Sequence, residues 1–271
     1  MSLPIPASGK VFTLEGLNTA AGIDFEPRDY MATFLQGKFS TAPYTRARLD
    51  YPASDSPLSI NTGVANLDKA VRNTSGQKII LAHSQGAQVV SRWINLYRLD
   101  VTAPSAANLM FILLGNPLRG VGGFGIGKPE VDGVTGVATR TDGPWTVVDI
   151  AQRYDGWADF PTDVNNKAAM AEAISGAFSI HTNYDPVSVT DPTLTQWTVG
   201  NTTYVLTKAE TVPRILRGYF LVGTEGDRIK ATVRAKIAAG YSNRPGSDPA
   251  ILPGIAPNVF WKRMLTNMGY A

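Results

Sequence analysis

The segment from Ile80 to Ala87 limits the possible fold more than any other part of this chain. It is an apolar run that ends in the pattern small-x-Ser-x-Gly, with Ala82 and Gly86 on either side of Ser84. This pattern is typical of a nucleophile elbow, in which a strand turns sharply into a helix and small residues let the two backbones pass closely. The alternative is an ordinary helix start with Ser84 as its N-cap. The elbow predicts a strand, a helix and a nucleophilic serine between them.

A nucleophilic serine needs a base to take its proton, and the chain contains two histidines, His83 and His181. The residue before an elbow serine points away from the reacting side, so we expect the His83 ring among neighbouring strands or loops. His181 follows a predicted helix and comes after Ser84 in the chain order of α/β-hydrolases. His181 is therefore the candidate base, and a hydrogen-bonded structural histidine is the alternative.

The acid of such a triad is expected between the serine and the histidine, at the end of a strand. Residues 146–151 form a β-rich run that leads into a turn with two carboxylates, Asp155 and Asp159. Asp155 comes directly after the strand and is the preferred acid. Asp159 lies deeper in the loop, where it is the alternative acid or a helix cap. Asp142 and Asp149 are expected to be solvated or structural.

Serine chemistry on a carbonyl also needs two backbone N–H groups that bind the developing oxyanion. Gln85, which follows the serine, is the first candidate. The second is Leu17, in the loop after the first predicted strand, with Asn18 or Thr19 as a side-chain contributor. Several aromatic residues would suit an acyl-chain groove, although aromatic residues more often belong to a core. These residues are Trp157 and Phe160, the two predicted substrate-binding residues, together with Trp197, Tyr204 and Tyr219.

Composition excludes several kinds of partner and chemistry. The 271 residues are 44% hydrophobic and 17% charged, which is enough for a large enzyme core, and the net charge of +3 is scattered, so no nucleic-acid partner is expected. The chain has no cysteine and two histidines, so we expect no metal. Serine chemistry of the kind predicted above needs no cofactor, so none is expected. Residues 1–10 lack the pattern of a signal peptide and no stretch approaches about 18 apolar residues, so a soluble chain without stable membrane insertion is expected.

Strand-like and helix-like segments alternate along the chain, which favours a mostly parallel central sheet flanked by helices. The expected strands are 11–14, 45–51, 78–82, 108–115 and 146–151, and the expected helices are 28–37, 61–73 and 86–99. Residues 195–207 predict a β-hairpin, and residues 216–240 a partly helical segment with a Lys/Arg-bearing face. We expect one α/β domain over 1–271, with 187–271 as a C-terminal extension or cap.

The glycine-rich stretch from Gly120 to Gly127 contains two patterns that look like phosphate-binding loops. A phosphate loop of the G-x-x-x-x-G-K type needs Ser or Thr after its lysine and a helix start, whereas Pro129 follows Lys128 here and turn formers continue to Gly143. We therefore expect a long mobile loop beside the reacting serine and no nucleotide site.

Six short segments resemble the PE-PPE C-terminal domain of mycobacteria and of related actinobacteria and phages. They are 51–53, 62–67, 83–87, 114–117, 154–161 and 181–184. Such domains are similar to cutinases and to mycobacteriophage lysin B esterases, so the resemblance implies an α/β-hydrolase fold and a serine esterase or lipase that acts on lipid esters. It carries the acid and base of the family onto Asp155 and His181. We expect no PE or PPE leader before the domain, and we expect either a phage-encoded enzyme or a bacterial one acting at the mycobacterial cell envelope.

The sequence therefore predicts a carboxylic-ester hydrolase in which Ser84 attacks the ester, His181 moves the proton, Asp155 orients the ring and water resolves an acyl-enzyme. The expected partner is a lipid or acyl ester, with a cell-envelope lipid as the narrower expectation. Two alternatives remain: an acyltransferase that delivers the acyl group to a sugar hydroxyl, and a catalytically silent binding module on the same fold.

Overall fold

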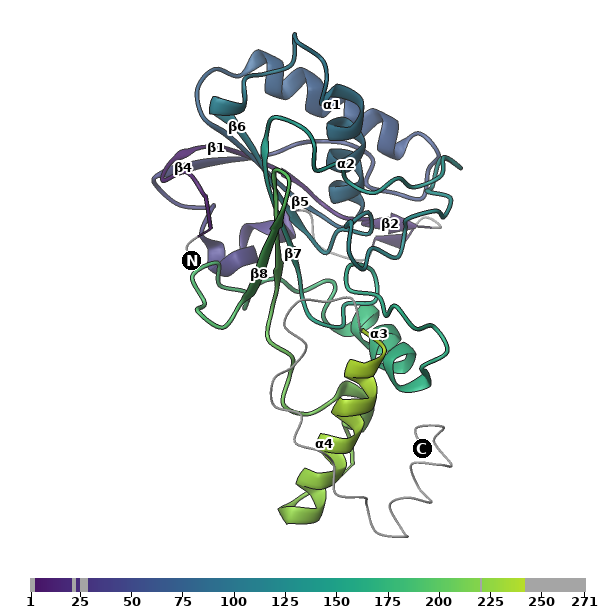
Figure 1. Ribbon diagram of the computed structural model, residues 1–271. Helices are drawn as coiled ribbons and strands as arrows, with labels where there is room; N and C mark the ends of the chain where they lie inside the picture. The colour runs from purple at the N-terminus through teal and green to yellow at the C-terminus, as the bar shows by residue number, and fades with distance from the viewer. Residues whose placement is uncertain (1–2, 21–22, 25–28, 220, 242–271) are drawn as a thin grey trace.

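The fold is built on one seven-stranded sheet (Figure 1). The computed structural model describes residues 3–20, 23–24, 29–219 and 221–241. The strands of the sheet are β1 (Gly9–Leu14), β4 (Tyr44–Arg48), β5 (Lys78–His83), β6 (Leu109–Leu114), β7 (Thr146–Ala151), β8 (Thr195–Val199) and β9 (Thr202–Leu206). Their order is β4-β1-β5-β6-β7-β9-β8, and every neighbouring pair is parallel except the β8–β9 hairpin. The predicted α/β-hydrolase fold is confirmed.

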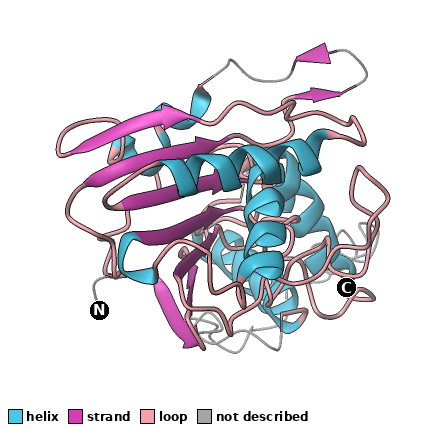
Figure 2. Ribbon diagram, turned by 90° about the horizontal axis from the view of Figure 1, so that it is seen from above, coloured by secondary structure: helices cyan, strands magenta, loops and turns pink. Residues whose placement is uncertain are grey.

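Both faces of the sheet are covered, because the central strands are apolar on both sides. Successive side chains of a strand point to opposite faces, so in β6 Phe111 and Leu113 pack toward α1 (Ser59–Asn73) and α2 (Gln85–Tyr97). Ile112 and Leu114 pack toward the other face, against the 3₁₀ helices η1 (Tyr30–Ala32) and η2 (Phe34–Gly37). Figure 2 shows helices lying across the strands in this layered arrangement.

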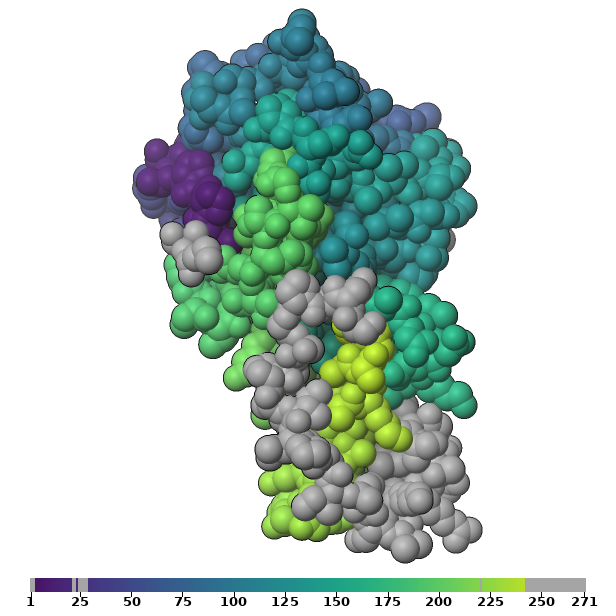
Figure 3. Space-filling view, viewed as in Figure 1, coloured from purple at the N-terminus to yellow at the C-terminus, as the bar shows by residue number. Residues whose placement is uncertain are grey.

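Two further helices lie together at one end of the molecule. Helices α3 (Lys167–Ser179) and α4 (Gly223–Ala239) pack through a small apolar cluster of their own, which includes Ala169, Ile229 and Val233. They form a narrower part below the body of the sheet (Figure 3). The remaining elements are the two-residue strands β2 (Thr19–Ala20) and β3 (Ile23–Asp24) and the short helices η3 (Ala106–Asn108) and η4 (Arg214–Leu216).

Most element predictions hold, and two are corrected. The prediction of a helix over 28–37 is wrong, because residues 30–37 form two 3₁₀ turns and Leu35 and Gln36 have positive φ angles of 55° and 59°, which no α-helix accommodates. Residue 28 lies outside the described residues. The strand expected at 45–51 is shorter than predicted and ends at Arg48.

The predicted hairpin is present, with Gly200 at φ 56° in its turn. Its strand β9 pairs in parallel with β7, so residues 195–206 belong to the edge of the central sheet and not to a separate cap. The boundary of an extension at 187 stays a prediction, and residues beyond 241 lie outside the described residues. Among the described helices, none combines the length and apolar character that crossing a bilayer requires.

Candidate active site

The chain reverses direction sharply at Ser84, between β5 and α2. Ser84 has φ 52° and ψ −116°, a backbone conformation that L-residues rarely adopt. A Cβ atom on Gly86 would lie 2.3 Å from the carbonyl oxygen of Leu14, so only glycine lets the new helix pass the neighbouring strand. Ala82, the other small position, is fully buried. The strand, sharp turn and helix that the pattern predicts are therefore all present.

Ser84, His181 and Asp155 form one chain of hydrogen bonds. The Oγ atom of Ser84 lies 2.8 Å from Nε2 of His181. The Nδ1 atom of the same ring lies 2.8 Å from Oδ2 and 3.0 Å from Oδ1 of Asp155. The three residues come from the β5–α2 turn, the loop after α3 and the loop after β7. Segments about 100 residues apart thus meet at the carboxyl ends of the parallel strands.

Helix α3, which precedes the loop of His181, packs closely against the turn that carries Asp155. A Cβ atom on Gly176, in α3, would lie 2.0 Å from the carbonyl oxygen of Tyr154. A Cβ atom on Gly156 would lie 2.3 Å from the carbonyl oxygen of Ala173. Because neither position has room for a side chain, α3 rests directly on the turn that carries the carboxylate, and the loop after α3 reaches it.

Asp155 is fully buried, yet its surroundings favour the charged form. Besides His181, its Oδ1 accepts the backbone N–H of Trp157 at 2.9 Å and its Oδ2 accepts the hydroxyl of Tyr184 at 3.3 Å. Burial by itself would raise the pKa of Asp155, but the charge and hydrogen bond of His181 outweigh it, so the pKa lies below its ordinary value. The group beside Nδ1 is therefore a carboxylate at neutral pH.

Asp159 is also fully buried but has a different position in the turn. Its Oδ2 accepts the backbone N–H of Tyr154 at 2.8 Å, and its own N–H donates to the carbonyl of Asp155. Since Tyr154 has a positive φ of 70°, this carboxylate stabilises a strained turn. Of the two candidate acids, Asp155 is the one that bonds the ring of His181.

The other two aspartates have the surroundings expected of structural or solvated groups. Asp149 is buried and pairs with Arg119 at 2.7 Å and with Asn116 at 2.9 Å. Asp142 lies at the surface, in ion pairs with Arg98 and Arg140.

Leu17 and Gln85 both line the cavity at Ser84, as the candidate oxyanion donors should. Neither backbone N–H has an acceptor within the part of the chain that the structure describes. The two residues after Leu17 are tied down, because the N–H groups of Asn18 and Thr19 donate to the carbonyl of Ala53 at 2.6 and 3.1 Å. The loop is thus fixed directly after Leu17.

The cavity at Ser84 has a volume of about 240 Å³ and a mixed lining. Trp157 forms part of its wall, with its ring 6.1 Å from that of His181. Phe160 packs behind, against Phe124, and is not among the lining residues. The lining consists of Leu17, Ser84, Gln85, Gln88, Pro117, Phe124, Gly125, Lys128, Pro129, Glu130, Val131 and Trp157.

The other aromatic residues expected near an acyl groove lie elsewhere. Trp197 and Tyr204 stack on each other at 5.4 Å, and both rings contact the guanidinium of Arg119. Neither lines the cavity at Ser84, and Tyr219 does not line it either. Trp197 and Tyr204 were expected in a β-hairpin, but the sequence does not indicate on which side of the sheet the rings of that hairpin lie.

A small hairpin over residues 125–136, which we call the flap, forms one wall of this cavity. Its strands meet through the N–H of Gly127 to the carbonyl of Gly136 and the N–H of Glu130 to that of Val134, both at 2.9 Å. The glycine-rich loop therefore leads into a hairpin and not into the helix that a phosphate site needs. The sequence predicted a loop beside Ser84 in this stretch but not its hairpin form.

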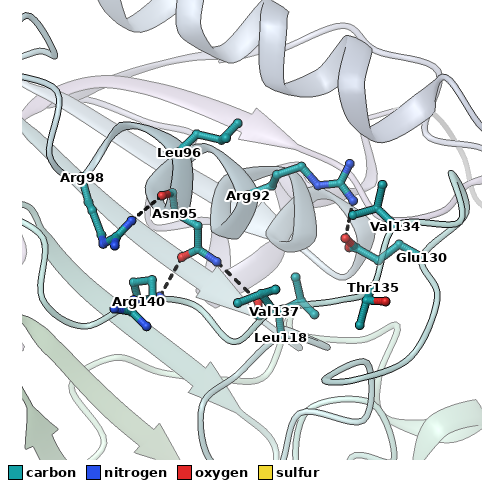
Figure 4. Close-up of a pocket in the computed structure, with 10 residues that line it drawn as sticks. All are labelled: Arg92, Asn95, Leu96, Arg98, Leu118, Glu130, Val134, Thr135, Val137 and Arg140. Atoms are coloured by element: carbon teal, nitrogen blue, oxygen red, sulfur yellow. Dashed lines mark hydrogen bonds and ion pairs between the residues drawn. The ribbon is translucent and has the colours of Figure 1, made fainter.

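Arg92 of α2 holds the flap against the helix. Its guanidinium pairs with the carboxylates of Glu130 and Asp132, both nearly buried. The other side of the flap walls a second cavity of about 420 Å³, which lies along α2 (Figure 4). Glu130 lines both cavities, so the ion pair stands at the boundary between them.

The layered sheet and the serine at the turn after β5 define an α/β-hydrolase. The chain belongs to the PE-PPE domain family, whose domain matches residues 41–242. The described residues include no group of three or more His, Cys, Asp or Glu side chains arranged to hold a metal ion.

Relatives from Mycobacterium tuberculosis match most of this chain. The PPE family protein PPE42 is 28% identical over 264 residues, which cover 88% of this chain and 43% of the relative. Esterase PE16 is 29% identical, covering 81% and 45%, and the SL1278 acyltransferase Chp1 is 28% identical, covering 77% and 56%. The chain thus spans about half the length of these relatives.

Two solved structures are similar in part. A cutinase-like protein from Cryptococcus sp. is 17% identical, with a TM-score of 0.41, over 60% of this chain and 86% of that one. Lysin B from mycobacteriophage D29 is 20% identical, with a TM-score of 0.40, over 61% of this chain and 72% of that one.

Proposed function

We propose that this protein is a serine hydrolase of carboxylic esters, with Ser84, His181 and Asp155 as its triad. The observation that carries the proposal is the continuous hydrogen-bond chain from Ser84 Oγ through the His181 ring to a buried carboxylate. A carboxylate at Nδ1 fixes the ring with its proton on that nitrogen, which leaves Nε2 as the acceptor for the serine proton. Similarity to a relative described as an esterase, PE16, supports the same activity.

In the first half of the reaction, Ser84 Oγ attacks the ester carbonyl while its proton moves to Nε2 of His181. The carbonyl oxygen becomes an oxyanion, and the N–H groups of Leu17 and Gln85 donate to it. The tetrahedral intermediate then collapses, the C–O bond to the alcohol breaks, and His181 returns the proton to the leaving alkoxide. An acyl-Ser84 ester and a free alcohol remain.

In the second half, water replaces the alcohol. His181 takes a proton from the water as its oxygen attacks the acyl carbon, and the same two amides bind the second oxyanion. Collapse breaks the bond to Ser84 Oγ, which regains the proton from His181. Asp155 remains ionised throughout and stabilises the imidazolium that forms twice per cycle.

A lipid ester is the substrate class that we propose. Apolar side chains of Leu17, Phe124, Val131 and Trp157 form much of the wall beside Ser84. Such a wall suits an acyl chain, whose burial is favourable in proportion to its apolar area. A lipid of the mycobacterial cell envelope is the narrower proposal within this class.

An acyltransferase is the second candidate, favoured by the relative described as an acyltransferase, Chp1. It would use the same acyl-enzyme, with a sugar hydroxyl in place of water as the acceptor. Hydrolysis and transfer differ in the fate of one intermediate, so both can be measured on one protein.

The test is hydrolysis of p-nitrophenyl butyrate, octanoate and palmitate by the wild type, with Ser84→Ala as the matched control. We expect turnover by the wild type, loss of turnover in the variant, and covalent labelling of Ser84 by a fluorophosphonate. Labelling without turnover, followed by acyl transfer when a sugar is added, would favour the acyltransferase. A folded wild type with neither labelling nor turnover would refute the proposal and favour a silent binding module.

A further inference from the structure

The side chain of His83 lies directly behind Ser84 and bridges two loops of the candidate site. Its Nε2 atom is 2.7 Å from the backbone oxygen of His181. Its Nδ1 atom is 2.9 Å from the hydroxyl of Tyr30, and that hydroxyl is 2.6 Å from the backbone nitrogen of Gly16. One uninterrupted series of hydrogen bonds therefore joins the loop of the candidate base to the loop of the candidate oxyanion donor.

The chemistry of the partners determines where each proton lies. A carbonyl oxygen can only accept, so Nε2 of His83 carries a hydrogen and donates it to His181. Burial first, and then the nearby charge of His181, lower the pKa of His83 to about 3, so the ring is neutral near pH 7. Its Nδ1 is then an acceptor for the hydroxyl of Tyr30, whose oxygen in turn accepts the N–H of Gly16.

The packing leaves the ring of His83 little freedom to move. The ring is 2% exposed and makes edge contacts with Phe34 at 5.2 Å and with Tyr184 at 5.6 Å between centroids. A Cβ atom on Gly16 would lie 2.8 Å from Cβ of Ser84 and 3.1 Å from Nδ1 of His83. The glycine therefore lets the loop that carries Leu17 rest against both the serine and the ring.

We propose that Tyr30 and His83 are positioning residues, which hold the backbone of His181 and the loop amide of Leu17 in register on either side of Ser84. They take no part in the bonds that form and break. The inference rests on the proposed hydrolase function, in which the base and the oxyanion donor must act on one carbonyl group at the same time. A displacement of about 1 Å in either would lower the rate substantially, because proton transfer and oxyanion binding both depend on accurate geometry.

A purely structural role for the same residues makes a different prediction. We call the series of hydrogen bonds through His83 and Tyr30 the bridge. If the bridge only adds stability, a variant that still folds should keep its turnover number and have a lower melting temperature. If it positions the reacting groups, the turnover number falls while KM changes little, because substrate binding in the cavity does not depend on Tyr30 or His83.

The first variant is Tyr30→Phe, which removes the hydroxyl and keeps the ring. We expect kcat for p-nitrophenyl butyrate to fall by about 10- to 100-fold, with KM within about twofold of the wild type. Tyr44→Phe is the matched control, because the Tyr44 hydroxyl donates to the carbonyl of Pro6 at 2.7 Å at the opposite ends of the parallel strands. An unchanged kcat in folded Tyr30→Phe would overturn the proposal.

Substitutions at His83 divide the bridge into its two halves. In His83→Gln the amide can still donate to the backbone oxygen of His181 from about the position of Nε2, whereas His83→Leu removes both contacts. We expect the loss of kcat to be smaller in the glutamine variant than in the leucine variant. If both variants fold and lose the same amount of kcat, the hydrogen bond from His83 Nε2 to the backbone oxygen of His181 does not contribute to positioning.

The protonation of His83 can be measured by NMR on the wild type without any assay of activity. With two histidines in the chain, ¹⁵N-histidine labelling yields two ring systems to assign. We expect His83 as a neutral Nε2–H ring at pH 7 that remains neutral at pH 5. The Nδ1–H tautomer, or protonation of His83 with a midpoint near 6.5, would refute the bridge. Absence of turnover and labelling with the expected tautomer would instead refute only the proposed function.

Discussion

The region around His83 and the region around His181 contain the same side chain in two different settings. The two rings lie 5.0 Å apart, and both are almost completely buried. His83 is bonded by a hydroxyl and a backbone carbonyl, two uncharged groups. His181 is bonded by a carboxylate on one nitrogen and by the hydroxyl of Ser84 on the other.

Because residue type and burial are nearly the same at the two positions, the difference between them lies in their hydrogen-bond partners. The carboxylate beside His181 stabilises a positive ring, which is what a base must become during the reaction. At His83, burial disfavours the charged ring, and its two hydrogen-bond partners, the Tyr30 hydroxyl and the His181 backbone oxygen, are uncharged. This ring is therefore suited to hold position and unsuited to take a proton.

The largest effect is expected when the candidate base is removed. His181→Ala should lower kcat for p-nitrophenyl butyrate by about 10⁴-fold or more, because it removes the ring nitrogen that is bonded to Ser84 Oγ. His83→Gln should lose far less, about 10- to 100-fold. Stopped-flow and steady-state kinetics on both folded variants measure the contrast. Similar losses of kcat in the two variants would mean that His83 and His181 do not have different roles.

The next effect compares the two buried carboxylates of the turn. Asp155→Asn should lower kcat by about 10⁴-fold, because an amide can favour the wrong tautomer of His181 and cannot stabilise its charged form. Asp159→Asn should retain kcat to within about tenfold and lose thermal stability, since its carboxylate accepts the N–H of Tyr154. Equal kinetic losses would argue that the whole turn, and not one carboxylate, supports His181.

A third variant tests the loop that the His83 bridge holds. Leu17→Pro removes the backbone N–H at the cavity and should lower kcat by roughly 10²- to 10³-fold. Leu17→Ala is its control, because it keeps the amide and shortens only the side chain. The comparison is made at saturating p-nitrophenyl butyrate. A similar kcat in the two variants would exclude this amide as an oxyanion donor.

Acidic pH should lower the stability of the folded protein, because His83 is held uncharged in the fold. Burial lowers the pKa of His83 from 6.5 to about 3, so between these values the unfolded chain binds a proton that the folded chain does not. The free energy of unfolding should therefore fall as the pH falls below about 6.5, by about 1.4 kcal/mol per pH unit from this one group. Urea unfolding from pH 7.5 to 5 measures the slope, and His83→Gln should reduce it. A slope unaffected by the substitution would assign the acid sensitivity to other groups.

The smallest kinetic effect is expected for substitutions at the rim of the cavity, where the side chains do not bond either histidine. Trp157 is 39% exposed and lines the cavity, so Trp157→Ala should raise KM for the octanoate ester by up to about tenfold and leave kcat nearly unchanged. Phe160→Leu, one layer behind, should change KM by less than about twofold. A larger effect from Phe160 would mean that the acyl chain passes behind Phe124.

Much of the site was predictable because its determinants are local. The elbow depends on small residues within two positions of Ser84, and the strand and helix on either side depend on short-range periodicity. The candidate base followed from the scarcity of histidine, and the candidate acid from its place directly after a strand. The flap was not predictable, because it depends on ion pairs between Arg92 and two carboxylates about 40 residues away.

The sequence by itself determined the class of fold, the position of the serine at the elbow and a short list of partners for it. The tertiary structure shows which of the two carboxylates bonds the His181 ring, because Asp155 and Asp159, four residues apart in one turn, point to different neighbours. It also decided that His83 bonds Tyr30 and the backbone of His181. The physical reason is that hydrogen bonds depend on direction at distances near 3 Å, and such directions between distant segments arise only when the core has packed.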